Sequence, residues 1–255
     1  MSIKSNRRSS HVLWLAACGV VAGGLLAGQA SAAALYWDGG TTTQSANNAV
    51  DGGVGYWQNG LVNWTNVGGD TESAWANVPV NDAVFSVAPA RVALNSNITV
   101  GNINFATPGY TIDLSRDLNS NSAGQPVFNL TASSLSGSSG TIQADSTFNT
   151  GTFTLDTPVS TTSTWSGTIG NVGSKMGFTK QGAGTFEYSG TLKTEYSNVN
   201  INGGTMKFVG AVNSSTNVFW NVNNSGTTLD LNGNTINGLD ISTPARARRL
   251  HRPVP

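Results

Sequence analysis

The sequence predicts an all-β fold, a parallel β-solenoid, on three observations. Apolar residues alternate with polar ones in short runs, which is typical of strands with one buried face. A Gly-Thr pair begins three of these runs, and its glycine falls at positions 184, 204 and 226, so the runs recur after 20 and 22 residues. Gly, Asn, Asp and Ser separate the runs, as in tight turns. Because one coil cannot bury its apolar face alone, this interval predicts one solenoid coil per repeat.

The repeated phrases lie between residues 178 and 239. They contain Lys180-Gln-Gly-Ala-Gly-Thr-Phe, Ile201-Asn-Gly-Gly-Thr-Met and Gly226-Thr-Thr-Leu-Asp-Leu-Asn-Gly. This word order resembles the autotransporter-associated β-strand repeat, which is found in passenger domains of bacterial autotransporters and in related exported repeat proteins. The resemblance implies a right-handed parallel β-helix outside the cell, and it carries over no catalytic residue.

The Asn-Gly pairs at 202, 232 and 237 are predicted to form coil corners, where a positive φ angle is needed, and the glycines of the repeated phrases are predicted to be structural positions of the repeat. The repeat-motif positions with this structural role are Gly182, Gly184, Gly203, Gly204, Gly226 and Gly233.

Length and charge limit the function classes. At 255 residues the chain is long enough for one domain with a sizeable core. Only 10% of residues are charged, and the body between the two ends holds all 13 acidic residues but only six of the 13 basic ones. No basic face remains there, so we expect no nucleic-acid partner.

Residues 1–33 are predicted to be a secretory signal peptide. Lys4, Arg7 and Arg8 precede an apolar segment at 12–27, and Ala30-Ser-Ala32 supplies a small-residue cleavage pattern. Two other interpretations stay open, lipoprotein acylation at Cys18 and twin-arginine export through Arg7-Arg8. We favour ordinary cleavage, after which we expect no membrane span and a secreted or cell-surface protein that depends on the export machinery.

Residues 34–90 form a tryptophan-rich segment that is predicted to cap the solenoid. A cap is needed because the first coil otherwise leaves an open strand edge. Its tryptophans have two possible roles, to fill the core of the cap or to stack on sugar rings as a glycan-binding face. We favour the cap, because this irregular segment has little else from which to build a core. The residues concerned are Trp37, Trp57, Trp64 and Trp75.

Residues 91–242 are predicted to be the solenoid repeats, with about three coils before residue 156 and two or three in 160–239. Gly140-Thr and Gly151-Thr lie only 11 residues apart, which predicts two sides of one coil. A turn is predicted at Gly101-Asn102. The expected early strands are 98–100, 103–105, 110–114, 127–130, 141–144 and 152–155.

Residues 243–255 form a basic tail rich in Pro and Arg. Three prolines exclude a ladder strand, so the tail is either disordered or the product of a frameshifted gene. We favour the frameshift, because the repeats stop where another coil is expected.

The body contains no cysteine and no histidine, which excludes disulfides, Ser-His or Cys-His nucleophiles and His/Cys zinc sites. Carboxylate chemistry remains, and glycoside hydrolysis needs two carboxylates across a groove. Glu187 and Glu195 lie on adjacent phrases and could project from one face. We favour the interpretation that both simply face solvent, and we expect no catalytic residue, metal or cofactor.

These observations predict an exported, non-enzymatic β-solenoid of the autotransporter passenger type. The resemblance implies a surface or secreted rod that aids its own secretion and mediates adhesion, with extracellular glycans or cell-surface components as partners. One alternative is a glycan-binding adhesin module that uses the tryptophan-rich region. A second alternative is a polysaccharide-degrading enzyme on a β-helix.

Overall fold

A computed structural model describes residues 32–116, 118, 125–145, 151–171, 175–194, 198–214, 218–236 and 239–240. These residues form strands and no helix, which confirms the all-β prediction for the described part of the chain. Within those ranges, no helix is long and apolar enough to cross a membrane. The predicted leader up to residue 31 and the tail at 243–255 lie outside the described residues.

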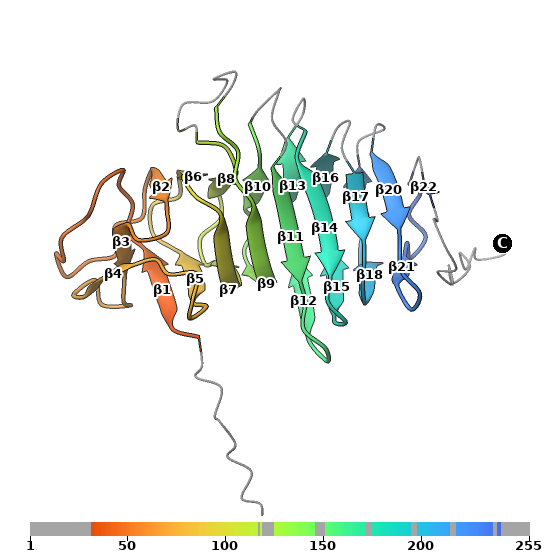
Figure 1. Ribbon diagram of the computed structural model, residues 1–255, viewed down its shortest axis with the longest axis horizontal. Coiled ribbons are helices and arrows are strands. Elements are labelled where there is room, and N and C mark those ends of the chain that lie inside the picture. The colour runs from red at the N-terminus through yellow and green to blue at the C-terminus, as the bar shows by residue number, and fades with distance from the viewer. Residues whose placement is uncertain are drawn as a thin grey trace, which may run out of the picture. The chain divides into compact units, whose positions relative to one another are not determined.

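The strands belong to three sheets, and Figure 1 shows the strands of the largest sheet side by side. Sheet 1 has 11 strands in the order β22-β20-β17-β14-β11-β9-β7-β5-β1-β3-β4. In chain order its strands are β1 (Ala34–Trp37), β3 (Val62–Thr65), β4 (Glu72–Ala74), β5 (Asp82–Phe85), β7 (Ile98–Phe105), β9 (Leu130–Gly137), β11 (Thr152–Asp156), β14 (Gly177–Gln181), β17 (Asn198–Ile201), β20 (Phe219–Val222) and β22 (Leu239–Asp240).

The other two sheets are smaller and entirely parallel. Sheet 2, in the order β19-β16-β13-β10-β8-β6-β2, contains β2 (Gly55–Trp57), β6 (Arg91–Leu94), β8 (Thr111–Asp113), β10 (Thr141–Gln143), β13 (Thr168–Asn171), β16 (Thr191–Thr194) and β19 (Asn213–Ser214). Sheet 3, in the order β12-β15-β18-β21, contains β12 (Thr162–Trp165), β15 (Thr185–Tyr188), β18 (Thr205–Phe208) and β21 (Thr228–Asp230).

From β11 onward the chain visits sheet 1, sheet 3 and sheet 2 in turn. Parallel strands need a crossover connection, and here the strands of the other two sheets supply it. Strands β11, β12 and β13 make one pass, β14 to β16 the next, and β17 to β19 the third. Each pass pairs in parallel with the pass before it. The Gly-Thr pairs at 140 and 151 begin strands of different sheets, β10 in sheet 2 and β11 in sheet 1, and β11 opens the next pass.

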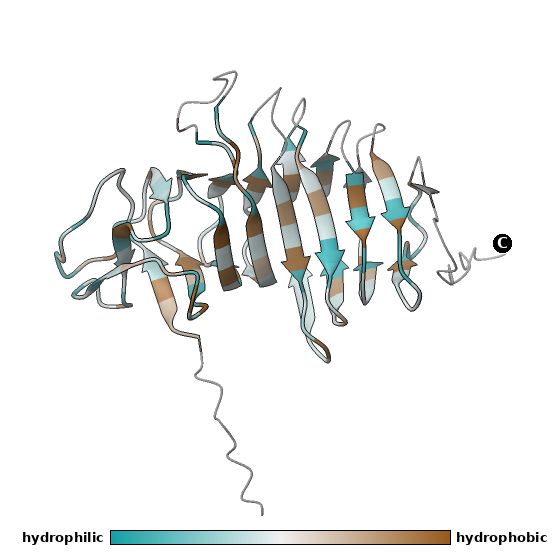
Figure 2. Ribbon diagram, in the orientation of Figure 1, coloured by the Kyte–Doolittle hydropathy of each residue, from teal (hydrophilic) through white to brown (hydrophobic). Residues whose placement is uncertain are grey.

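The core follows from this pairing. In-register parallel strands place equivalent residues of successive passes on the same side, so apolar residues form continuous columns. One column of sheet 1 consists of Phe153, Phe178, Val199 and Trp220, all buried. The rings of Phe153 and Phe178 stack with centroids 5.5 Å apart. Figure 2 shows hydrophobic and hydrophilic bands alternating along several of these strands.

The predicted turn at Gly101-Asn102 is wrong. Strand β7 runs through it and pairs with β9 over its whole length, from Ile98 to Phe105. The backbone N–H of Gly101 donates to the Asn81 carbonyl (2.8 Å), and that of Asn102 donates to Asp82 Oδ1 (2.7 Å). Because β5 and the residue before it satisfy both donors, the strand continues through these two residues. Strand β9 begins at Leu130, where the strand predicted at 127–130 ends, so the observed strand is displaced along the chain from the predicted one.

The third repeated phrase has a different register from the predicted one. Thr185 pairs with Thr205 and Thr205 with Thr228, so the intervals are 20 and 23 residues. Thr227, and not Gly226, therefore occupies the position that Gly204 has in the pass before. The connection from β20 to β21 contains one residue more than the Gly-Thr spacing indicates.

The N-terminal part of sheet 1 departs from the parallel pattern. Strand β1 pairs in parallel with β5 on one side and antiparallel with β3 on the other, and β3 pairs antiparallel with β4. A segment without regular structure, residues 38–54, follows β1 and returns to β2 in sheet 2. The change from parallel to antiparallel pairing thus falls in the tryptophan-rich segment, whose composition also differs from that of the repeats.

Candidate functional site

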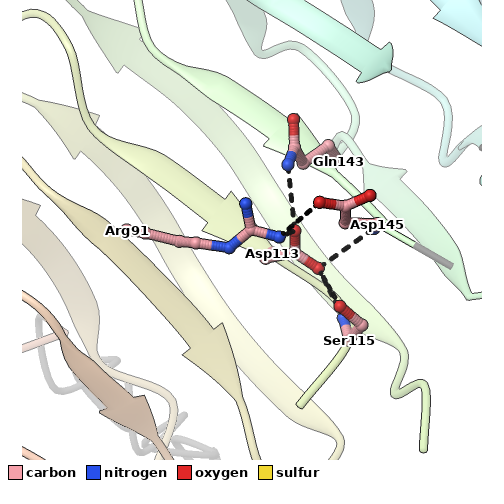
Figure 3. Close-up of polar contacts among 5 residues, drawn as sticks. All are labelled: Arg91, Asp113, Ser115, Gln143 and Asp145. Carbon is pink, nitrogen blue, oxygen red and sulfur yellow. Dashed lines mark hydrogen bonds and ion pairs between the residues drawn. The ribbon is translucent and has the colours of Figure 1, made fainter. Parts of the chain in front are cut away.

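Sheet 2 contains a buried polar cluster, and Figure 3 shows Arg91, Ser115, Gln143 and Asp145 gathered around the Asp113 carboxylate. Asp113 on β8 lies in register with Gln143 on β10. Nη2 of Arg91, on β6, donates to Asp113 Oδ2 and to Asp145 Oδ2, the latter at 2.9 Å. Gln143 Nε2 also donates to Asp113 Oδ2 at 3.0 Å.

The other carboxylate oxygen of Asp113, Oδ1, also accepts several hydrogen bonds. Oδ1 accepts hydrogen bonds from the backbone N–H of Ser115 (2.8 Å), the Ser115 hydroxyl and the backbone N–H of Asp145 (3.2 Å). The Asp113 side chain is 0% exposed. Burial raises the pKa of Asp113, and the Arg91 guanidinium opposes that rise. A carboxylate that is buried and hydrogen-bonded on both oxygens has no free position for a substrate, so this cluster joins β6, β8 and the segment after β10 structurally.

The four tryptophans of the N-terminal segment lie inside the molecule. Trp37, Trp57 and Trp64 are 0% exposed and Trp75 is 1% exposed. The ring centroids of Trp64 lie 5.1 Å from Trp37 and 4.7 Å from Trp75. Trp37 Nε1 donates to the Gly53 carbonyl at 2.8 Å. No indole face is exposed in this packing, so the burial of these residues gives no support to the alternative role in stacking on sugar rings.

The predicted repeat glycines lie at or beside the connections between strands. Gly182 and Gly184 stand between β14 and β15, Gly203 and Gly204 between β17 and β18, and Gly226 and Gly233 flank β21. Gly204 has a φ of 62°, and a Cβ there would lie 2.2 Å from the Gly184 carbonyl oxygen. This corner therefore needs glycine both for its conformation and for close contact between successive passes.

Lys180, the lysine of the first repeated phrase, has a structural role in the interior. It occupies an inward position of β14, in register between Leu155 and Ile201, and is 0% exposed. Its Nζ donates to the carbonyls of Gln181 (2.7 Å), Gly182 (3.1 Å) and Gly203 (3.1 Å). Burial lowers the pKa of Lys180 to about 8, and the charge of Asp156 opposes this. The amine thus links the corners of two successive passes, a role that strand alternation alone does not reveal.

The carboxylates considered for catalysis do not form a described pair. Glu187 lies on β15 and forms an ion pair with Lys207 on β18, with 3.1 Å between Oε1 and Nζ. The register places Asp230 on the other side of Lys207. Glu195 lies outside the described residues. Among the residues that the structure describes, no group of three or more His, Cys, Asp or Glu side chains could hold a metal ion.

The strand faces turned away from the core carry regular polar columns that sequence reasoning missed. Threonines begin successive strands of sheets 2 and 3 in register, and the Gly-Thr pairs were the signal for them. The column in sheet 2 is Thr111, Thr141, Thr168 and Thr191, and the column in sheet 3 is Thr162, Thr185, Thr205 and Thr228. β-Branched residues suit this position because they pack against their cross-strand neighbours.

Sheet 1 has an uncharged outer column. It consists of Thr131, Thr154, Thr179, Asn200 and Asn221, paired strand by strand. Asn221 Nδ2 donates to Asn200 Oδ1 at 3.0 Å. Each of these side chains is partly exposed. The column therefore presents hydroxyl and amide groups at the regular interval of the ladder, about 4.8 Å.

A comparison with known proteins finds one relevant similarity. The chain is 32% identical over 196 residues to a protein named adhesin BmaC autotransporter from Brucella suis biovar 1 (strain 1330). The aligned part is 75% of this chain but 4% of that protein, so the chain spans only a small part of its curated relative. No family model matches the chain, and no solved structure matches it.

Proposed function

We propose that this chain is an exported, non-enzymatic segment of the autotransporter passenger type. Its body would be a right-handed parallel β-helix of autotransporter-associated β-strand repeats, with a cap at 34–90 and coils at 91–242. The observation that supports this most is the succession of passes through three sheets, each in parallel register with the pass before. The similarity to an autotransporter adhesin supports the same assignment.

The proposed place of action is the cell surface or the medium, with residues 1–33 as the export leader. Each completed pass offers a ladder edge on which the next pass pairs, so folding can proceed pass by pass as the chain emerges. Such stepwise pairing would aid the chain's own secretion. The body contains no cysteine, so this mode of assembly needs no disulfide formation.

The proposed activity is adhesion to extracellular glycans or other cell-surface components. The buried tryptophans disfavour a contact through the N-terminal segment. The uncharged outer column of sheet 1 is a better candidate, because its hydroxyl and amide groups suit neutral polar ligands. An enzymatic role has less support, since Glu187 is engaged by Lys207.

Location can be tested with an antibody against the purified full chain. We expect it to label intact cells or to detect the protein in the culture medium. Labelling only after the cells are permeabilised would contradict the proposed export.

Adhesion can be tested with beads coated with the full chain and offered to host cells. Thr179→Asp and Asn200→Asp place charges on the outer face of sheet 1, and Thr185→Asp places one on sheet 3 as a matched control. We expect the first two variants to lower bead binding at least about tenfold, which corresponds to about 1.4 kcal/mol. Equal losses for all three variants, or binding by heat-unfolded chain, would count against this face.

A further inference from the structure

Two acidic residues meet on the face of the N-terminal strands opposite the tryptophan core. Thr65 on β3 pairs with Tyr36 on β1 and with Glu72 on β4. Asp38 directly follows β1, and its backbone N–H donates to the Asn63 carbonyl at 3.2 Å. Successive residues of a strand point to opposite faces, so these groups lie on the side away from Trp37 and Trp64.

This acidic pair is buried and lacks a positive partner. Asp38 is 5% exposed, and both carboxylate oxygens of Glu72 are buried, with the Asp38 carboxyl and the Thr65 hydroxyl as polar neighbours. Asp38 Oδ1 accepts from the backbone N–H of Asp51 at 2.6 Å. The ion pairs found among the described residues lie elsewhere, on Asp113, Asp145 and Glu187.

Two buried carboxyl groups without a cation cannot both ionise at low cost. Burial raises the pKa of Glu72 to about 7, and the nearby charge of Asp38 adds to the rise, with a smaller contribution from Asp51. Burial also raises the pKa of Asp38. The pair therefore retains a proton under conditions in which exposed carboxyl groups have lost theirs.

We propose that Asp38 and Glu72 share one proton and form a pH-sensitive latch that holds strand β4 and its partner β3 against β1. Strand β4 is the terminal strand of sheet 1, so it is held by one neighbour only. When the pair loses its proton, two negative charges face each other, and β4 is the element that can move to separate them. The latch thus controls access to the tryptophan cluster beneath it.

The direction of the pH effect follows from proton binding. Between the ordinary pKa of 4.5 and the folded value of about 7, the folded chain holds a proton that the unfolded chain has lost. The free energy of unfolding therefore falls as pH rises through this window and is constant above it, as far as this pair is concerned. The acids that face Glu72 are Asp38 from the end of β1 and Asp51 from the segment before β2. Asp70, in the β3–β4 turn, has a pKa lowered by hydrogen bonds from Asn66 and Thr71, and its effect lies at lower pH with the opposite sign.

The test uses the full chain at pH 5 and pH 8. Hydrogen exchange, corrected for intrinsic rates, reports on β3 and β4, and tryptophan fluorescence reports on the cluster. We expect faster exchange in β4 and a Tm lower by about 3–6 °C at pH 8. In Glu72→Gln both differences should disappear, whereas the matched control Glu187→Gln should retain them.

Asp38→Asn gives a second variant should Glu72→Gln fold poorly. Unchanged pH dependence in either folded variant would overturn the latch. Adding Ca²⁺ at pH 8 gives an independent readout. A Tm that rises with Ca²⁺ in the wild type, and does not rise in Glu72→Gln, would also overturn the proposal, since a cation and not a proton would then occupy the pair.

Discussion

The N-terminal segment and the repeated passes bury apolar residues in different ways. In the passes, buried side chains lie over their register equivalents in the next strand, as Phe153 stacks on Phe178 and Phe178 pairs with Val199. In the N-terminal segment, tryptophans from three different strands and one connection pack against one another and against Phe85. The passes repeat the same packing of buried side chains from one strand to the next. The N-terminal segment instead depends on a single cluster of aromatic side chains. A substitution in the core of the passes should therefore disturb only the neighbouring strands, whereas one in the N-terminal segment should disturb the whole aromatic cluster.

The largest effect is expected for Trp64→Ala. Trp64 contacts Trp37, Trp57, Trp75 and Phe85, so its removal leaves a cavity at the centre of the cluster. We expect a loss of about 3–5 kcal/mol and loss of the near-ultraviolet circular dichroism signal of the cluster. Phe178→Leu in the passes is the comparison, and it should cost about 1 kcal/mol. Equal losses would remove the distinction between the two regions.

Arg91→Ala should lower the free energy of unfolding by a similar amount, here by removing the positive partner of a buried carboxylate. It leaves Asp113 buried without its cation, which costs about 3–5 kcal/mol for pairs of this kind. Chemical denaturation measures the loss. Arg116→Ala is the matched control, because Arg116 is exposed and lies over the Tyr56 ring at 5.8 Å. A loss below about 1 kcal/mol for Arg91→Ala would mean that the cluster does not tie the strands of sheet 2 together.

Lys180→Met is expected to cost about 1–3 kcal/mol at neutral pH, because three carbonyls lose a charged donor. The pH dependence of the free energy of unfolding identifies the contribution of Lys180 more specifically. The folded pKa of about 8 lies below the ordinary 10.5, so between these values the unfolded chain holds the extra proton and the free energy of unfolding rises with pH. This rise should vanish in Lys180→Met and persist in Lys193→Met. Its persistence in Lys180→Met would assign the rise to another group.

The smallest effects concern two glycines with positive φ. Gly204 is crowded by the backbone of the preceding pass, whereas Gly226, with a φ of 80°, has open space around its Cβ position. We expect Gly226→Ala to cost about 1 kcal/mol for the left-handed backbone alone, and Gly204→Ala to cost more. Thermal unfolding of the two variants measures the difference, which is the part due to contact between passes.

Local patterns predicted most of the fold. Alternating residues around Glu187 and Lys207 indicated strands, and the Gly-Thr pairs indicated where strands begin. The turn predicted at Gly101-Asn102 is wrong because these two residues continue a strand when neighbouring residues at 81 and 82 satisfy their N–H groups. The candidate sites were harder to predict. Asp113 alternates with apolar residues as a solvent-facing residue would, and only its partners on other strands bury it.

The sequence by itself determined the all-β class, the repeat in the second half and the separate character of the tryptophan-rich segment. Each depends on residues close together in the chain, where strand alternation and turn chemistry act locally. The tertiary structure alone decided which sheet each strand joins, that Lys180 faces inward to hold two corners, and that Asp38 meets Glu72. Those outcomes depend on register between distant segments, because burial, and with it the cost of charge, is set by what packs on a residue from elsewhere in the chain.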